Sequence, residues 1–165
     1  MEEFFTSLVH AYGLPLLVVL LFLKGSLVGK PFIPATVVIP AYAFVAGIAG
    51  YRILLLTAFT AAATTAGQLA VFLKCRRDGD AVLDAVPFLD RESGKTEKAY
   101  DYFEEHRFRA IFVANMVTGF RGLMSVPAGA SGYSTTRFLM AAYPSTFVYH
   151  TVVTVVFAGS LRYLL

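Results

Sequence analysis

One arginine lies in a stretch of sequence that is otherwise free of charge. Arg121 stands in NMVTGFRGLMSVPAG, residues 115–129, between two longer apolar runs. A guanidinium stays protonated in proteins and prefers a carboxylate or a phosphate as its partner. The chemistry expected of Arg121 is therefore anion binding, and the partner that supplies the negative charge has to be found.

Carboxylates are confined to a short part of the chain. Nine of the eleven acidic residues lie between residues 78 and 105, and the other two are Glu2 and Glu3. In the apolar segments, Arg121 can therefore meet a backbone carbonyl, a neutral amide such as Asn115 or Gln68, a group from another subunit, or a ligand. An unpaired charge at the centre of a bilayer costs at least about 2.5–3.5 kcal/mol. A phosphate, which a guanidinium binds through two hydrogen bonds, would offset that cost.

The composition is that of a membrane protein. Of the 165 residues, 57% are hydrophobic and 15% are charged, whereas soluble domains average about 45–50% apolar and about 25% charged residues. The length allows one domain. The basic residues are scattered between long apolar runs, so no nucleic-acid partner is expected. The sequence predicts an all-α, multi-pass protein of the cell membrane.

The apolar runs define the elements that must position Arg121. Uncharged runs of about 20 residues are long enough to span a bilayer, whereas runs broken by Pro and Gly are not expected to form straight helices. The expected segments are a first membrane helix at 4–23, a re-entrant hairpin at 31–50, a transmembrane helix at 53–73, a polar segment at 74–109, a second re-entrant hairpin at 110–133 and a transmembrane helix at 138–160.

Charge and an internal similarity predict the topology. Lys and Arg concentrate in 74–109, which the positive-inside rule places in the cytoplasm, and the two interrupted segments then enter from opposite faces. AGIAGY at 46–51 recurs as AGASGY at 128–133, which indicates an inverted repeat unless it is a chance match in an alanine-rich chain. Interrupted segments at matching places in two halves are typical of transporters with a midplane site. The polar segment should also carry a surface helix from about Thr96 to Arg107.

Several polar residues have two interpretations. Arg121 binds a ligand, or it caps helix carbonyls or reaches the headgroups. Asn115 and Gln68 are site residues, or they link helices. His150 is a packing histidine or a proton carrier. Four further basic residues near the predicted interfaces are membrane anchors or substrate contacts; these are Lys24, Lys30, Arg52 and Arg137.

Three stretches of the sequence resemble the DedA family, also called VTT or SNARE-associated membrane proteins. They are GKPFIPATVVIPAYAFVAG (29–47), AGQLAVFLKCRRDG (66–79) and YFEEHRFRAIFVANMVTGFRGLMSVPAGASGYSTTRF (102–138). The resemblance implies a fold with two opposed re-entrant hairpins. It also implies a role in moving lipids, including phospholipids and polyprenyl phosphates, across a bilayer.

The resemblance also assigns positions. Arg121 matches the second arginine, and Gly119 the glycine, of the family's Arg-Phe-x-Pro-Gly-x-Arg core. Four positions depart from the family pattern: Asn115 replaces the first arginine, Thr118 the proline, Thr36 a glutamate of the first hairpin and Gln68 an aspartate of the spanning helix. These losses remove the charge pairs that proton coupling would use, while anion binding by Arg121 remains expected.

The leading hypothesis is a transporter, scramblase or flippase for a phosphate-bearing lipid. The alternative is an accessory or assembly membrane protein that keeps the scaffold without transporting, and a homodimer is compatible with both. Enzymatic activity and a cofactor are not expected, since the embedded segments contain only His10 and His150 as acid–base groups. The candidate substrate-binding residues are Arg121, Asn115, Gly119, Thr36, Gln68, Pro34, Lys30 and Arg137.

Overall fold

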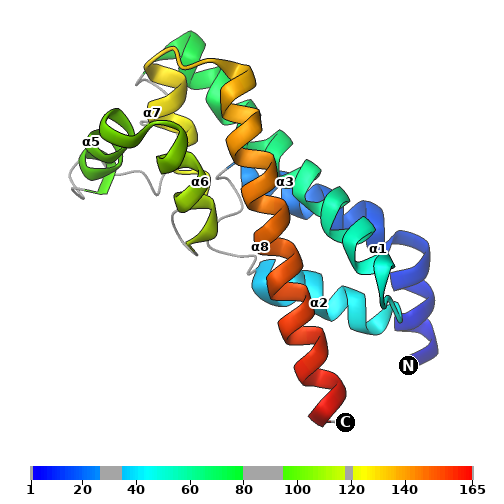
Figure 1. The fold of residues 1–165 in the computed structure, drawn as a ribbon. Helices are drawn as coiled ribbons and strands as arrows, with labels where there is room; N and C mark the ends of the chain where they lie inside the picture. Colours follow the sequence, from blue (N-terminus) through cyan, green and yellow to red (C-terminus); the bar gives the residue numbers. More distant parts are fainter. Residues whose placement is uncertain (1, 27–34, 80–94, 118–120, 165) are drawn as a thin grey trace.

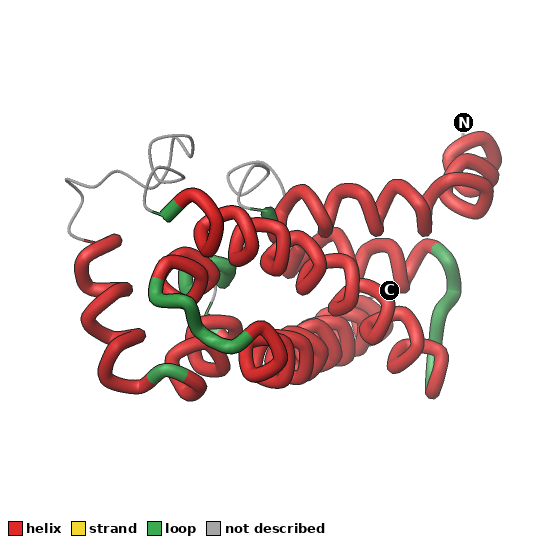
Figure 2. The backbone as a smooth tube through the Cα atoms, turned by 90° about the horizontal axis from the view of Figure 1, so that it is seen from above, coloured by secondary structure: helices red, strands yellow, loops and turns green. Residues whose placement is uncertain are grey.

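The computed structural model describes residues 2–26, 35–79, 95–117 and 121–164, and every regular element in these ranges is a helix. The views in Figures 1 and 2 show α5, α6 and α7 grouped at one end of the long helices α3 and α8, with both chain termini toward the other end. The helices are α1 (Glu2–Gly25), α2 (Ala35–Val45), α3 (Tyr51–Asp78), α5 (Lys95–His106), α6 (Phe108–Met116), α7 (Ser125–Ala130) and α8 (Thr135–Leu164).

Within the described residues, two helices are long and apolar enough to cross a membrane. They are α3, over Tyr51–Asp78, and the part of α8 over Thr135–Phe157. The 28 residues of α3 correspond to about 42 Å of helix, compared with about 30 Å for the hydrocarbon core of a bilayer. Large apolar side chains, among them Phe59, Leu73 and Val156, are exposed on the outer faces of these helices. This combination is compatible with an integral membrane protein.

Glycines let α1 pack directly on α3. A Cβ atom on Gly67 would collide with the backbone of α1 at Phe22 and Gly25, and a Cβ atom on Gly25 would collide with the carbonyl of Thr64. Small residues allow such close approach between helices when packing, rather than hydrophobic burial, drives their association. The small residues of α3 thus admit a neighbouring helix at close range.

The apolar core has two clusters with a polar region between them. One joins the last turns of α3 to α5, α6, α7 and the start of α8, and contains the stacked rings of Phe72 and Phe138. The other joins α1, α2 and the first half of α3, and includes Leu21 and Ile39. The α3 residues between the clusters include buried Thr, Gly and Gln. Gln68, which is considered below, lies in this intermediate region, whereas Thr57 and Thr60 lie alongside the second cluster.

Two short helices end in the same hydrogen-bond pattern before a long helix begins. After α2, Gly47 N–H donates to the Phe44 carbonyl and Ile48 N–H to the Ala43 carbonyl. After α7, Gly132 and Tyr133 donate in the same way to Gly129 and Ala128. Both central glycines have positive φ, 63° at Gly47 and 67° at Gly132, as the Schellman motif requires. These glycines are 85 positions apart, so the structural equivalence is shifted by three from the 82-residue sequence match.

The predicted interruptions correspond to helix breaks in the second half. The expected segment at 110–133 contains α6, a bend at Val117, a turn at 121–124 and α7. In the first half, α2 continues through Pro40, and the residues 27–34 that precede it lie outside the described residues. The surface helix expected at 96–107 is confirmed as α5, which buries Ala99 and Phe103 in the first core cluster.

Candidate functional site

Arg121 lies inside the helix assembly. Its exposed fraction is 8%. Nε and Nη2 donate hydrogen bonds of 3.1 and 2.8 Å to the main-chain carbonyl of Asn115, in the last turn of α6. On its flat face, the guanidinium carbon is 3.6 Å from the centroid of the Tyr149 ring on α8, a cation–π contact that gains strength where water is excluded. Among the described carboxylates, none forms an ion pair with Arg121.

The guanidinium of Arg121 has a second edge, Nη1–Nη2, that points away from the Asn115 carbonyl. The Asn115 carbonyl takes two of its five N–H groups, both on the Nε–Nη2 edge. The Nη1–Nη2 edge points away from that carbonyl, because the two edges of the planar group diverge by about 120°. Arg121 therefore has the helix-capping contact considered as one alternative, and a second edge with the geometry for a two-bond contact with phosphate.

The Asn115 side chain connects three helices. Gln68 Nε2 on α3 donates to Asn115 Oδ1 over 2.9 Å, and Asn115 Nδ2 donates to Ser145 Oγ on α8 over 3.1 Å. Asn115 and Gln68 are 3% and 1% exposed, and buried amides are costly unless they are paired. The structure thus brings together three of the candidate residues, since Arg121 and Gln68 both donate to Asn115, and Asn115 in turn donates to Ser145.

A second set of polar contacts joins α3 to α8. Thr60 Oγ1 is 3.0 Å from Nδ1 of His150, and Thr57 Oγ1 is 2.9 Å from Thr151 Oγ1. Thr60 and His150 are 0% and 1% exposed. His150 is next to Tyr149 in the chain, and their ring centroids are 6.2 Å apart. The Arg121 cluster and the threonine–histidine contacts are therefore neighbours along α8.

The other candidate residues are not placed in this cluster. Arg137 is exposed near the start of α8, twelve residues before Tyr149 and so about 18 Å away along the helix. Thr36 lies in the first turn of α2, and its side chain is not described. Lys30, Pro34 and Gly119 lie outside the described residues. Their assignment to a site stays a prediction.

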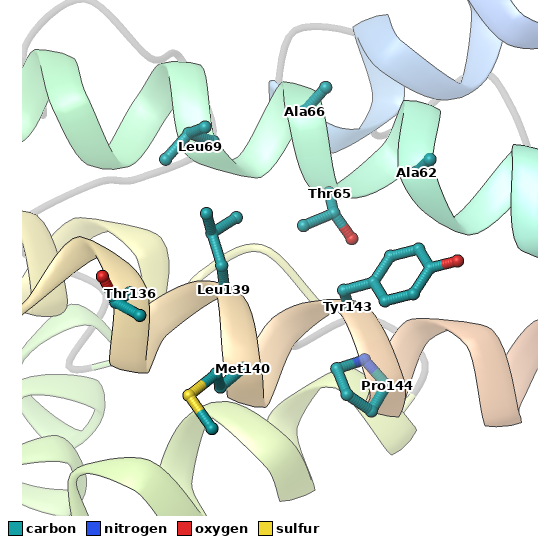
Figure 3. A pocket seen from close by; sticks show the side chains of 9 residues that line it. All are labelled: Ala62, Thr65, Ala66, Leu69, Thr136, Leu139, Met140, Tyr143 and Pro144. Atoms are coloured by element: carbon teal, nitrogen blue, oxygen red, sulfur yellow. The ribbon is translucent and has the colours of Figure 1, made fainter.

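A groove between α3 and α8 opens on a different side from Arg121. It has a volume of about 630 Å³, and Figure 3 shows Thr65 and Leu139 pointing into it from the two helices. At 100° per residue, its α8 residues Met140 and Tyr143 lie on the face opposite to Ser145 and Tyr149. The groove is lined mainly by apolar side chains and does not reach the Arg121 cluster along that face of α8.

Sequence reasoning missed Tyr149, which contacts Arg121, and Ser145, which bonds to Asn115. Tyr149 and Ser145 lie in an apolar run without a motif, and only their spacing of four residues shows that they share a face of α8. Which face meets Arg121 depends on the rotation of α8 against α6, and the sequence does not give that rotation. Among the described residues, no three His, Cys, Asp or Glu side chains come together as a metal site requires.

The fold and the cluster define a class of protein at a coarse level: a helical chain with two helices of membrane length and a buried cationic side chain. No protein-family model matches the chain, and no solved structure matches it. It is 22% identical over 157 residues to undecaprenyl phosphate transporter A of Staphylococcus aureus (strain NCTC 8325 / PS 47), and the match covers 91% of this chain and 75% of that protein. This match supports a distant relationship to a lipid-phosphate transporter.

Proposed function

We propose that this protein is a membrane transporter that moves a phosphate-bearing lipid, a polyprenyl phosphate or a phospholipid, from one leaflet to the other. In this proposal, Arg121 binds the phosphate group inside the protein. The observation that carries the proposal is a buried guanidinium that forms no ion pair with a described carboxylate and has an edge turned away from its capping carbonyl.

The energetics of Arg121 support an anionic ligand. It contacts the Asn115 carbonyl oxygen and the Tyr149 side chain, whose neutral groups carry partial rather than full negative charge. A positive group in a low-dielectric interior remains costly until a counter-ion arrives. A phosphate on an amphiphile can approach from within the bilayer, where a soluble anion is rare. Arg121 would therefore select lipids by the charge of their head group.

The named relative supports the choice of substrate class. The Staphylococcus aureus protein carries undecaprenyl phosphate transport in its name, and undecaprenyl phosphate is a single apolar chain that ends in a phosphate. In our proposal the interrupted segments at 31–50 and 110–133 are re-entrant hairpins that enter from opposite faces, and the polar segment 74–109 is cytoplasmic. Transport follows the lipid gradient, as in a scramblase, and uses no nucleotide.

Transport by purified protein tests the proposal. The protein is reconstituted in phosphatidylcholine vesicles with undecaprenyl phosphate, and a membrane-impermeant phosphatase is added outside. Lipid that reaches the outer leaflet releases inorganic phosphate, so the slow phase of release measures transport. We expect Arg121→Ala to reduce this rate at least about tenfold, because a hydrogen bond to a charged group contributes about 1.5–3 kcal/mol.

Arg77→Ala is the matched control, because it removes the same charge from a side chain that is 88% exposed. It should transport at the wild-type rate. Equal rates for wild-type protein, Arg121→Ala and protein-free vesicles would refute the transporter. A wild-type rate that Arg121→Ala leaves unchanged would refute the role of Arg121.

A second candidate function is a non-transporting accessory or assembly protein. The observation that favours it is the direction of both Arg121 hydrogen bonds, which end on one main-chain carbonyl in the last turn of α6. A cation at the C-terminal end of a helix also interacts favourably with the helix dipole. In this case Arg121→Ala would lower the stability of the fold, and the wild-type protein would not move lipid in the vesicle assay.

A further inference from the structure

Three buried polar atoms lie in a row along α8. Thr146 Oγ1, His150 Nε2 and Thr154 Oγ1 have no hydrogen-bond partner among the described residues, and their residues are at most 1% exposed. Positions spaced by four lie on one face of a helix, so the three atoms follow one another at intervals of about 6 Å. Buried polar groups are nearly always hydrogen-bonded, and a row without partners indicates that something else binds there.

The hydrogen bonds of Thr60 determine what His150 can offer. Thr60 has one hydroxyl proton, which it can donate to the Thr57 carbonyl, 3.1 Å away, or to His150 Nδ1, 3.0 Å away. If it donates to Nδ1, the neutral imidazole carries its proton on Nε2, and the atom without a partner is a hydrogen-bond donor. Rotation of one hydroxyl therefore sets His150 to donate to an anion without becoming charged.

The surroundings of His150 are positive. Among the described side chains, Arg121 and Lys24 interact electrostatically with it, and they come from the turn before α7 and from α1. Tyr149 links the two groups, since its ring lies under the Arg121 guanidinium and next to the imidazole. A hydrogen-bond acceptor that carries negative charge is the complement of a donor in such positive surroundings.

We propose that His150 is a second binding residue for the phosphate head of the lipid and donates to it from Nε2 while Arg121 holds the same group. This inference rests on the proposed function. It gives a binding role to His150, for which the sequence allowed either a packing role or proton transfer. Thr146 and Thr154 provide hydroxyls one turn to either side. They continue the polar row along α8 in both directions from the phosphate.

The wild-type protein allows a direct test. Protein labelled with 15N-histidine is placed in phosphatidylcholine nanodiscs, and its 15N spectrum is recorded with and without undecaprenyl phosphate. We expect the Nε2 signal of His150 to shift to that of a hydrogen-bonded donor when the lipid phosphate is present. The signals of His10 and His106 should not change, and they serve as internal controls.

Two variants separate binding from packing. In His150→Asn, the amide reaches the position of Nδ1 but not that of Nε2, whereas the longer side chain of His150→Gln places its amide near Nε2. We expect undecaprenyl phosphate to bind about tenfold more weakly to H150N than to wild-type protein, because the variant loses a hydrogen bond to a charged group. H150Q should bind within about threefold of wild-type protein, because its amide still donates.

The outcomes distinguish this inference from the proposed function. Suppose that Arg121→Ala abolishes binding, that H150N binds the lipid like wild-type protein, and that the Nε2 signal of His150 does not shift when lipid is added. Then Arg121 binds phosphate and the inference about His150 is wrong. If Arg121→Ala binds the lipid like wild-type protein, the proposed function fails and the inference fails with it. An Nε2 signal already at the donor position in lipid-free nanodiscs would indicate a water contact only and would overturn the inference.

Discussion

The two halves of the chain share a plan and differ in their chemistry. In each, a short apolar helix ends at a glycine with positive φ and a long apolar helix follows, α2 before α3 and α7 before α8. The second half adds a buried cation, Arg121, with Asn115 and Tyr149 around it. The described part of the first half adds neutral groups, the amide of Gln68 and the hydroxyls of α3.

The difference indicates a division of roles. The second half supplies the buried guanidinium of Arg121, and α3 of the first half supplies neutral hydrogen-bonding partners that order the residues around it without neutralising it. Gln68 fixes the Asn115 side chain and Thr60 fixes the His150 ring. An acid at either α3 position would pair with the cation and compete with a ligand. Neutral partners on α3 therefore suit a site that binds an anion from outside.

The largest effect on stability is expected where the two halves meet. Asn115→Ala leaves Gln68 Nε2 without its partner and removes the hydrogen bond that Ser145 Oγ accepts, and it should reduce the free energy of unfolding by about 2 kcal/mol. Gln68→Ala removes one of these bonds, so about 1 kcal/mol is expected. Unfolding in sodium dodecyl sulfate, followed by circular dichroism, measures both changes.

The double variant Gln68→Ala/Asn115→Ala sharpens this comparison. Because the two side chains are bonded to each other, its loss should be smaller than the sum of the single losses. Ser160→Ala, an exposed position whose hydroxyl bonds within its own helix, is the control and should unfold like wild-type protein. Additive losses would contradict a direct link between the halves.

The smallest effect tests whether the two glycine caps are equivalent. Gly47 and Gly132 have nothing within 4 Å of an added Cβ, so alanine there costs only the strain of positive φ, about 1 kcal/mol at each site. The two losses should agree within a few tenths of a kcal/mol in the same unfolding assay. Gly13→Ala, at a helical glycine without positive φ, should cause no loss. A large loss at only one of the two caps would show that the halves are not built alike there.

The elements were predictable because their signals are local. The charge-free run of α3, the amphipathic pattern of α5 and the small residues that admit α1 are each visible in a short window of sequence. Asn115 and Gln68 were singled out as polar residues in apolar surroundings, and they do contact each other. Such residues must find partners, so their pairing follows from a general requirement.

The details of the cluster were not predictable because they depend on helix rotation. Tyr149, Ser145 and Thr60 are ordinary residues of apolar helices, and a rotation of about 100°, one residue, would turn them away. The 82-residue sequence match also differs from the hydrogen-bond equivalence of Gly47 and Gly132. Short Ala- and Gly-rich segments can be aligned at several offsets, whereas equivalent backbone caps define one alignment of the two halves.

Detecting a direct contact between Arg121 and a lipid phosphate is the measurement that tests the proposed function most directly. Solid-state NMR with 31P–15N dipolar recoupling, on arginine-labelled protein in bilayers that contain undecaprenyl phosphate, reports guanidinium nitrogens in direct contact with phosphorus. The Arg121 signal is assigned by its loss in Arg121→Lys. We predict that this signal is dephased by 31P, as a two-bond contact with phosphate requires. An Arg121 signal that shows no dephasing, while the exposed arginines at the membrane surface do, would contradict phosphate binding by the buried guanidinium.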